Sequence, residues 1–287
     1  VNNLLSHVHR ITVMVFEYFK NLNQRRQRLL DGLQYATNIK RSCERMYIAV
    51  ISGILMRIAM SFLSRNEAQM KRFTNNFVHR STITDRVFYL RKFLRYLYET
   101  FELNVFQVKA GYKESDLECC FIFIERSVVS RIYNLAIYPN GQTNIDGDRF
   151  FSQQLSSLVK DDKHIMDILN MSQLKERVIP WSKLISNIAV LNSFKTSRDK
   201  MKRILYCIDA VEDTWRNAQI DYESTDIVTA MEILIIKANC PALLSNFRYI
   251  NQYKSSSPIH DFSSLSAKWS LFETALLNRN SDLGDIL

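Results

Sequence analysis

The chain is predicted to be all-α, and three observations support this prediction. Only six Gly and four Pro punctuate its 287 residues, which is too few for the tight turns of an all-β or alternating βα architecture. Apolar residues recur at spacings of three and four, as on the buried face of an amphipathic helix. The 47% of hydrophobic residues suffice for a substantial core in one large or two modest domains.

The front of the chain is predicted to be a basic helical bundle over residues 1–110. Its most membrane-like run is Met46–Leu63, which has about the length of a membrane span. Arg57 would lie well inside such a span at a cost of about 2.5–3.5 kcal/mol, so the sequence favours a central helix of a soluble bundle. The expected helices cover residues 3–22, 24–63, 65–78 and 83–105.

Aromatic side chains interleave with basic ones toward the end of this bundle. Their spacings are those of a helix core, which favours packing over base-stacking platforms for nucleic acid. The residues concerned are Phe77, Phe88, Tyr89, Phe93, Tyr96, Tyr98 and Phe101.

Charge is distributed unevenly along the sequence. Residues 1–110 carry 18 Lys and Arg against 7 Asp and Glu, a net charge of +11, whereas residues 111–287 carry 20 against 22, a net charge of −2. The basic surface has three interpretations: a solvated or partner-facing surface, a contact with an anionic endosomal membrane, or a contact with nucleic-acid phosphates. The first is preferred, and nucleic acid is the least favoured partner.

Neither cofactor binding nor covalent chemistry is predicted. The five cysteines form no C-x-x-C pair and lie near no histidine cluster, which indicates reduced thiols in a cytoplasmic protein rather than a metal site or a disulfide framework. The sequence also lacks a nucleophile elbow and a phosphate-binding glycine loop. The cysteines are Cys43, Cys119, Cys120, Cys207 and Cys240.

The middle of the chain is predicted to alternate helices and one clear loop. Residues 118–138 keep helical spacing despite the strand-like sequence CFIFI. The stretch from Pro139 to Asp148 is rich in turn formers and is expected to be irregular. Helices are expected over residues 149–159 and 161–170, and Pro180 is expected to open another helix.

Two helical signals follow between Arg198 and Tyr253. In the first, an apolar stripe from Met201 to Trp215 leaves the charged residues on the solvent side, and Thr196 and Ser197 suit the unpaired amides of a first turn. The charged residues assigned to the solvent side are Lys200, Lys202, Arg203 and Asp209. The second helix, from Ile227, is apolar on all sides and should be buried until Pro241 prevents its continuation beyond Asn239.

Several motifs in this region resemble one family. SRDKM and IIKANCPALLSNFRYINQY are similar to the Pro-Arg-Asp-Lys-Leu and Lys-Ala-Asn-Pro-Pro-x-Leu-x-Ser-Asn-x-x-Tyr-Ile segments of the Vps nine (vacuolar protein sorting nine) domain. Ile124, Glu125, Arg126, Arg131, Ile132 and Tyr133 resemble the helix that opens its core. The resemblance covers residues 117–280. It implies a layered helical domain over residues 111–287, with the basic bundle packed against it.

The resemblance also implies a function. Domains of this family bind Rab-type small GTPases of the early-endosomal (Rab five) subclass and act as guanine nucleotide exchange factors, in the cytoplasm and peripherally on endosomal membranes. The family's functional aspartate lies in an Ala-Asp-Asp-Phe-Leu-Pro turn, where its carboxylate competes with phosphate at the nucleotide site. Counted forward from Arg198, Asp226 takes this position, whereas Thr225 takes it when counted back from Asn239. The turn's proline is absent.

Asp226 is therefore the predicted catalytic residue, with helix N-capping as its alternative role. The GTPase switch loops are expected in a groove between the helix from Asp226 and a closing helix from about Phe262. His260 and Asp261 stand where the family has a tyrosine pair. The predicted GTPase-binding residues are Thr225, Ile227, Ala230, Met231, Tyr249, His260, Asp261 and Phe262.

Two other functions stay open. One is a degenerate Vps nine fold that serves as a scaffold or adaptor in endosomal trafficking and binds a Rab or another partner without exchange. The other is a helical membrane or nucleic-acid binder that uses its basic front half.

Overall fold

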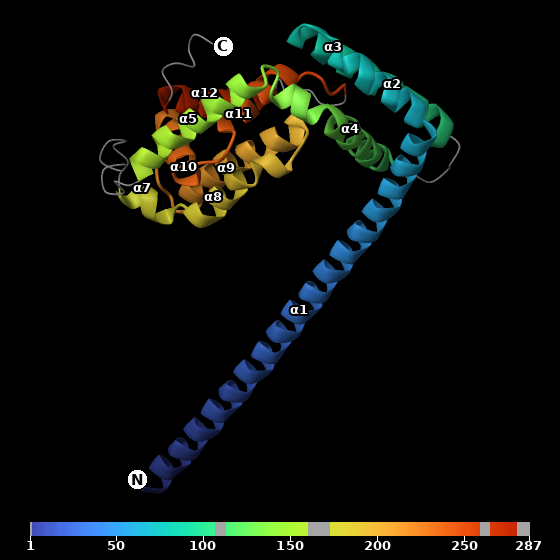
Figure 1. Cartoon of the computed structure of the whole chain (residues 1–287). Coiled ribbons are helices and arrows are strands. Elements are labelled where there is room, and N and C mark those ends of the chain that lie inside the picture. Colours follow the sequence, from blue (N-terminus) through green and yellow to red (C-terminus); the bar gives the residue numbers. More distant parts are fainter. Residues whose placement is uncertain (1, 107–112, 160–172, 259–264, 280–287) are drawn as a thin grey trace. The chain divides into compact units, whose positions relative to one another are not determined.

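The computed structural model describes residues 2–106, 113–159, 173–258 and 265–279, and every regular element in these ranges is a helix (Figure 1). The all-α prediction is confirmed. In chain order the elements are α1 (Asn2–Arg65), α2 (Glu67–Val78), α3 (Ile83–Phe101), a short π-helix η1 (Glu102–Phe106), α4 (Glu114–Ile137), α5 (Gln142–Val159), α7 (Gln173–Val178), α8 (Trp181–Ala189), a 3₁₀ turn η2 (Leu191–Ser193), α9 (Ser197–Asn217), α10 (Ser224–Ala238), α11 (Leu243–Tyr253) and α12 (Ser266–Arg279).

The chain divides into two compact units, residues 1–57 and 58–287. In the first unit the described residues all belong to α1, so the predicted break between helices 3–22 and 24–63 is wrong. Nothing in the sequence forces that break, because the first proline of the chain is Pro139. Helices α2 and α3 belong to the second unit, and the domain boundary near residue 110 stays a prediction.

One segment of α1, Thr37–Arg65, is long and apolar enough to cross a membrane, judged by length and composition within the described residues. Its two ends differ in burial. Leu55, Ala59, Phe62 and Leu63 are buried, as expected for a bundle helix, but every side chain from residue 37 to residue 50 is exposed. The central-helix interpretation therefore fails for residues 46–54, because a lone helix has no neighbour within its own unit to cover it.

The second unit begins with an aromatic layer between α2, α3 and α4. The rings of Phe73 and Phe93 stack with centroids 4.1 Å apart, and those of Tyr98 and Phe121 stack at 4.3 Å. The packing role predicted for the aromatic residues is confirmed for the buried Phe77, Tyr98 and Phe101. It is wrong for Phe88 and Tyr96, which are exposed because they lie on the outer face of α3.

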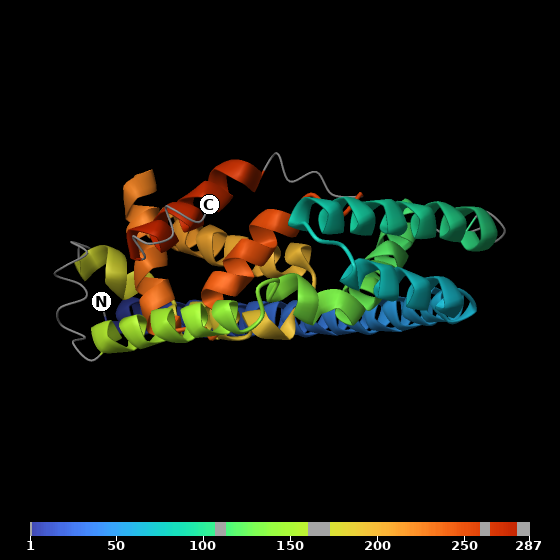
Figure 2. The ribbon, with the colours of Figure 1, turned by 45° about the horizontal axis from the view of Figure 1, so that its top comes forward.

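Helix α5 starts earlier than predicted. The expected loop ends at Gly141, whose positive φ of 56° suits a residue without Cβ, and Gln142–Asp148 is helical. The Asn144 side chain accepts a hydrogen bond from the Asn140 amide (2.8 Å) and closes the turn. Asp148 then accepts one from the Ser245 amide (3.0 Å) at the start of α11, so α5 and α11 lie side by side (Figures 1 and 2).

Helix α10 lies at the centre of the main hydrophobic core, against α5, α8, α9 and α12. Its residues 230–236 are all buried, which confirms that this helix is covered on most sides. It ends at Asn239 in the left-handed conformation (φ 36°), which asparagine tolerates better than most residues. Helix α8 opens directly after Pro180, as predicted.

Candidate functional site

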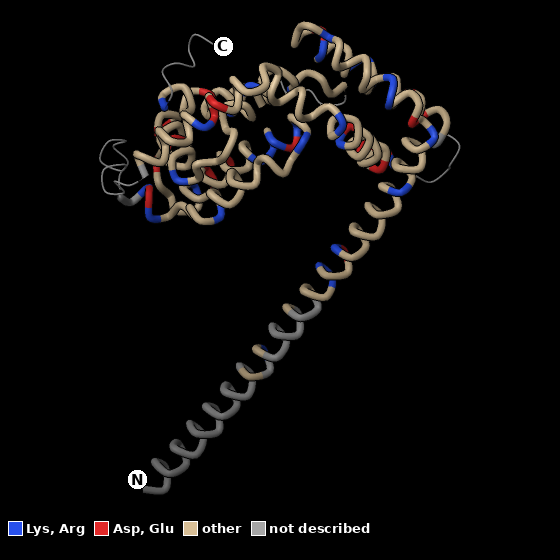
Figure 3. Tube along the Cα trace, in the orientation of Figure 1, with Lys and Arg blue, Asp and Glu red and all other residues tan. Residues whose placement is uncertain are grey.

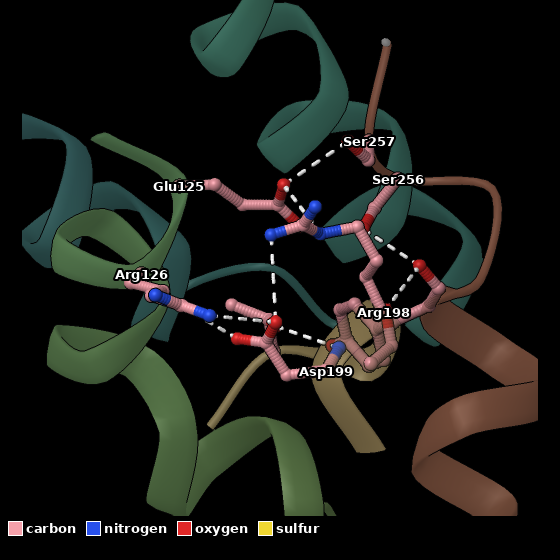
Figure 4. Close-up of polar contacts among 9 residues, drawn as sticks. Glu125, Arg126, Arg198, Asp199, Ser256 and Ser257 are labelled. Carbon is pink, nitrogen blue, oxygen red and sulfur yellow. Dashed lines mark hydrogen bonds and ion pairs between the residues drawn. The ribbon is translucent and has the colours of Figure 1, made fainter. Parts of the chain in front are cut away.

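Several residues that carry the family resemblance meet in a partly buried polar network, in which Arg126 is exposed and Glu125, Arg198 and Asp199 are buried (Figure 4). Arg126 of α4 donates two hydrogen bonds to the Asp199 carboxylate of α9, at 2.7 and 3.0 Å. Arg198 lies between Asp199 (3.4 Å) and Glu125 (4.0 Å). Ser257, after α11, donates to Glu125 at 3.1 Å. The network joins three segments distant in sequence, so these motif residues hold the fold together.

The carboxylates of this network respond differently to their surroundings. Burial raises the pKa of Glu125. The positive charge of Arg198, at 4.0 Å, lowers this pKa but offsets the effect of burial only in part. Burial pushes the pKa of Asp199 in the same direction, but the two hydrogen bonds from Arg126 and the one from Thr196 outweigh it and lower that pKa. Thr196 is the N-cap of α9 and accepts from the Asp199 amide at 3.1 Å, as its position predicted.

Lys200 is fully buried, so its predicted place on the solvent side of α9 is wrong. The reason is that the whole first turn of α9 is covered by neighbouring parts of the chain, so Arg198 and Asp199 are buried as well as Lys200. The Lys200 ammonium donates to the Leu191 carbonyl (2.9 Å) and to the Asn246 side chain. Burial, helped by the nearby charge of Lys195, lowers its pKa to about 7.

Asp226 lies in the first turn of α10, on the surface and partly exposed. Its carboxylate accepts a hydrogen bond from the Glu223 amide (2.8 Å), which forms a capping box with Glu223 as the N-cap. The Lys175 ammonium of α7 lies 2.7 Å from the same carboxylate. Partial burial pushes the pKa of Asp226 upward, but Lys175 and the Glu223 amide outweigh it and lower the pKa.

Lys175 was not predicted from the sequence. It is 51 positions before Asp226, and no spacing rule connects them. Its place is fixed by α9, because the Trp215 indole donates to the Lys175 carbonyl at 3.0 Å. The sequence pointed to Trp215 as a buried residue at the end of the apolar stripe of α9, but it did not indicate that Trp215 would contact Lys175.

The other predicted site residues separate into three groups. Thr225 is exposed beside Asp226. Ile227, Ala230, Met231 and Tyr249 face the core with at most 4% exposure, so a partner can reach them only if the core opens. His260, Asp261 and Phe262 lie outside the described residues. The surface brought together at the start of α10 is therefore Thr225, Asp226 and Lys175.

Two further features bear on the kind of site. Within the described ranges, no group of three His, Cys, Asp or Glu side chains is placed to hold a metal ion. A hollow of about 460 Å³ runs along Phe88, Arg91, Lys92 and Arg95 of α3.

Comparisons with known proteins point to one group. No model of a known protein family matches the chain. The mouse GTPase-activating protein and VPS9 domain-containing protein 1 is 29% identical over 196 residues, 68% of this chain and 13% of that protein. Receptor-mediated endocytosis protein 6 of Caenorhabditis elegans is 25% identical over 134 residues, 45% of this chain and 12% of that protein.

A plant protein gives a similar result. Vacuolar protein sorting-associated protein 9A of Oryza sativa subsp. japonica is 24% identical over 153 residues, 52% of this chain and 31% of that protein. Together these similarities support a relationship between this chain and proteins with a VPS9 domain, the Vps nine domain named above. The chain spans 13% of the length of the first of them.

Proposed function

We propose that this chain is a guanine nucleotide exchange factor for a Rab-type small GTPase of the early-endosomal (Rab five) subclass. The observation that carries the proposal is the exposed start of α10, where Thr225 and Asp226 lie; the motif resemblance aligns this turn with the family's acidic turn. Named relatives with a VPS9 domain support it. The protein would act in the cytoplasm at endosomal membranes.

The mechanism requires a carboxylate that is free to approach the partner's nucleotide site. Asp226 is charged at neutral pH, since its pKa is lowered. It would have to leave Lys175, and an ion pair this close to solvent contributes only about 0–1 kcal/mol. Its negative charge would then compete with phosphate for the magnesium and the P-loop lysine of the GTPase.

The buried residues of α10 would take a supporting part. Ile227, Ala230 and Met231 fix the helix in the core, so the Asp226 backbone is held in place while its side chain moves. Contacts of His260, Asp261 and Phe262 with the GTPase remain part of the proposal. Binding that holds the switch loops away from magnesium weakens nucleotide affinity, and nucleotide weakens the complex by the same factor.

A second candidate function has an observation in its favour. One oxygen of the Asp226 carboxylate, Oδ2, already contacts both the Glu223 amide and Lys175. If these contacts persist in the complex, Asp226 only stabilises the helix start, and the chain binds a Rab or another partner as a scaffold or adaptor without exchange.

The test is release of a fluorescent nucleotide from a panel of Rab GTPases, with thermal unfolding measured on the same variants. Asp226→Asn keeps an oxygen for the Glu223 amide but removes the charge. We expect it to lose at least about tenfold of the acceleration with little change in Tm. An unchanged release rate in Asp226→Asn, with a lowered Tm in Asp226→Ala, which lacks the capping oxygen, would leave only the capping role.

Three further variants sharpen this test. Lys175→Met frees the Asp226 carboxylate and should preserve or raise the rate. Asp213→Asn removes an exposed carboxylate of α9 that pairs with Arg216, and it should change nothing. If Thr225→Val abolishes release while Asp226→Asn does not, the functional position is Thr225. Rab binding without any acceleration would favour the scaffold.

The basic front half is proposed to contact an anionic endosomal membrane. Arg91, Lys92 and Arg95 lie exposed along one face of α3, next to the exposed Phe88. No ion-pair partner for these three cations occurs within the part of the chain that the structure describes. Each cation held near an anionic surface contributes about 1 kcal/mol.

A further inference from the structure

The largest group of exposed apolar side chains in the described residues lies on α1. Eight of the seventeen large hydrophobic residues that are exposed belong to it. Monomeric soluble proteins rarely expose contiguous apolar patches beyond a few hundred Å², and larger ones mark binding sites for proteins or membranes. The exposed residues are Ile39, Met46, Tyr47, Ile48, Val50, Ile54, Met56 and Met60.

This apolar segment is bounded by cations at both ends. No charged residue lies between Arg45 and Arg57, as the uninterrupted neutral stretch of α1 in Figure 3 shows. Thr37–Arg65 contains five Lys and Arg and a single acidic residue, Glu44, which gives a net charge of +4. Apolar side chains between cations match the layers of a membrane surface, hydrocarbon and anionic headgroups.

The exposed part of this segment, residues 46–56, is too short to span a bilayer. A span requires about 20 apolar residues, but Leu55, Ala59, Phe62 and Leu63 are already buried in protein. Residues 46–56 alone cover about 16 Å at 1.5 Å per residue. This length suits a helix that lies parallel to the membrane in the membrane–water interface. Its apolar atoms would lie below the lipid headgroups, and its two ends would lie at the depth of the headgroups.

A second copy of the chain fits the segment less well. A two-stranded coiled coil needs a narrow seam of interlocking side chains with a heptad repeat. Ile39, Met46, Gly53 and Met60 do recur every seven residues, but glycine offers no side chain to interlock with a partner helix at that position. Arg57, four positions after Gly53, would place charge against charge along a parallel seam.

We propose that residues 46–56 of α1 insert into the interface of an anionic membrane, with Arg41, Arg45 and Arg57 at the lipid phosphates. Their long side chains can reach the headgroups while the helix backbone lies deeper. This inference deepens the membrane contact proposed above, but it does not depend on nucleotide exchange.

The experiment is co-sedimentation of the full chain with vesicles of phosphatidylcholine and phosphatidylserine (3:1), without any GTPase. Met46→Glu/Val50→Glu places two charges on exposed positions of one helix face. We expect this variant to bind at least about tenfold more weakly than the unmodified chain. Phe150→Glu/Val190→Glu, which alters two apolar residues of similar exposure outside α1, should bind like the unmodified chain.

A second measurement reports the depth of insertion. Cys43 is exposed and lies three residues before the segment; in a Cys119→Ser background it can carry a polarity-sensitive dye. A blue shift of the dye on adding anionic vesicles is expected, and it should be absent in Met46→Glu/Val50→Glu. Circular dichroism controls for folding of each variant.

Two results would overturn the proposal. One is vesicle binding that is absent or that the α1 variant leaves unchanged. The other is a dimer in solution, seen by sedimentation equilibrium, that Met46→Glu/Val50→Glu dissociates while vesicles bind neither protein, which would assign the surface to a second copy. Because no GTPase is present, either result leaves the exchange proposal to its own test.

Discussion

At the scale of single residues, the buried lysine of α9 has the clearest measurable consequence. The pKa of Lys200 is lowered from 10.5 to about 7 by burial. Between these two values the unfolded chain binds a proton that the folded chain lacks, so stability must rise with pH across this window. Below about pH 7 both states are protonated and this group adds no pH dependence.

This leads to a prediction for pH-dependent unfolding. In urea titrations at several pH values between 6 and 9, the unmodified chain should gain stability above pH 7, with a slope approaching about 1.4 kcal/mol per pH unit. Lys200→Met has no group to titrate, and Lys195, Tyr133 and Cys240 around it are unchanged. The variant should therefore lack this gain, and parallel pH profiles for the two proteins would contradict the assignment.

At the scale of elements, two ion pairs fix α4 to its neighbours and differ mainly in burial. Arg126 binds the Asp199 carboxylate of α9, which is 9% exposed, whereas Arg131 binds Glu67 of α2, which is 39% exposed. Both arginines make two hydrogen bonds to one carboxylate. The pairs thus compare a buried carboxylate, which Arg198 and Thr196 also contact, with an exposed one that its arginine binds in the same way.

We predict that Arg126→Ala costs about 1–3 kcal/mol of unfolding free energy, because it leaves a buried carboxylate without its main partner. Arg131→Ala should cost less than about 1 kcal/mol, since water can replace the arginine at Glu67. Chemical denaturation of both variants checks this. Equal losses would mean that the buried network does not carry the connection between α4 and α9.

At the scale of the whole molecule, the division at Arg57 makes a prediction about truncation. The second unit has its own core, built from α5 and α8–α12, and every side chain of residues 37–45 is exposed. A chain that starts at residue 46 should therefore unfold within about 2 °C of the full chain in a circular dichroism melt. A decrease of more than about 5 °C would show that the front of α1 stabilises the rest.

Much of the fold could be predicted from the sequence, because local rules decide it. The scarcity of Gly and Pro and the helical spacing predicted an all-α chain, Pro180 marked the start of α8, and Thr196 capped α9 as expected. The all-round apolar sequence after Ile227 predicted a buried helix, since such a surface cannot remain in water. The motifs beside these elements also indicated the relationship to VPS9-domain proteins.

Only the tertiary structure decided which polar residues are buried and which apolar residues are not. Periodicity placed Lys200 in solvent, and the cost of Arg57 in a membrane span favoured a core helix around Met46. Both placements were wrong, because exposure depends on what packs against a helix and not on its sequence alone. The same holds at the candidate site. The sequence proposed Asp226 as a site residue, but no sequence spacing predicts its ion pair with Lys175, 51 positions away. Tertiary packing brings the two together, and the Trp215 indole of α9 hydrogen-bonds the Lys175 carbonyl of α7.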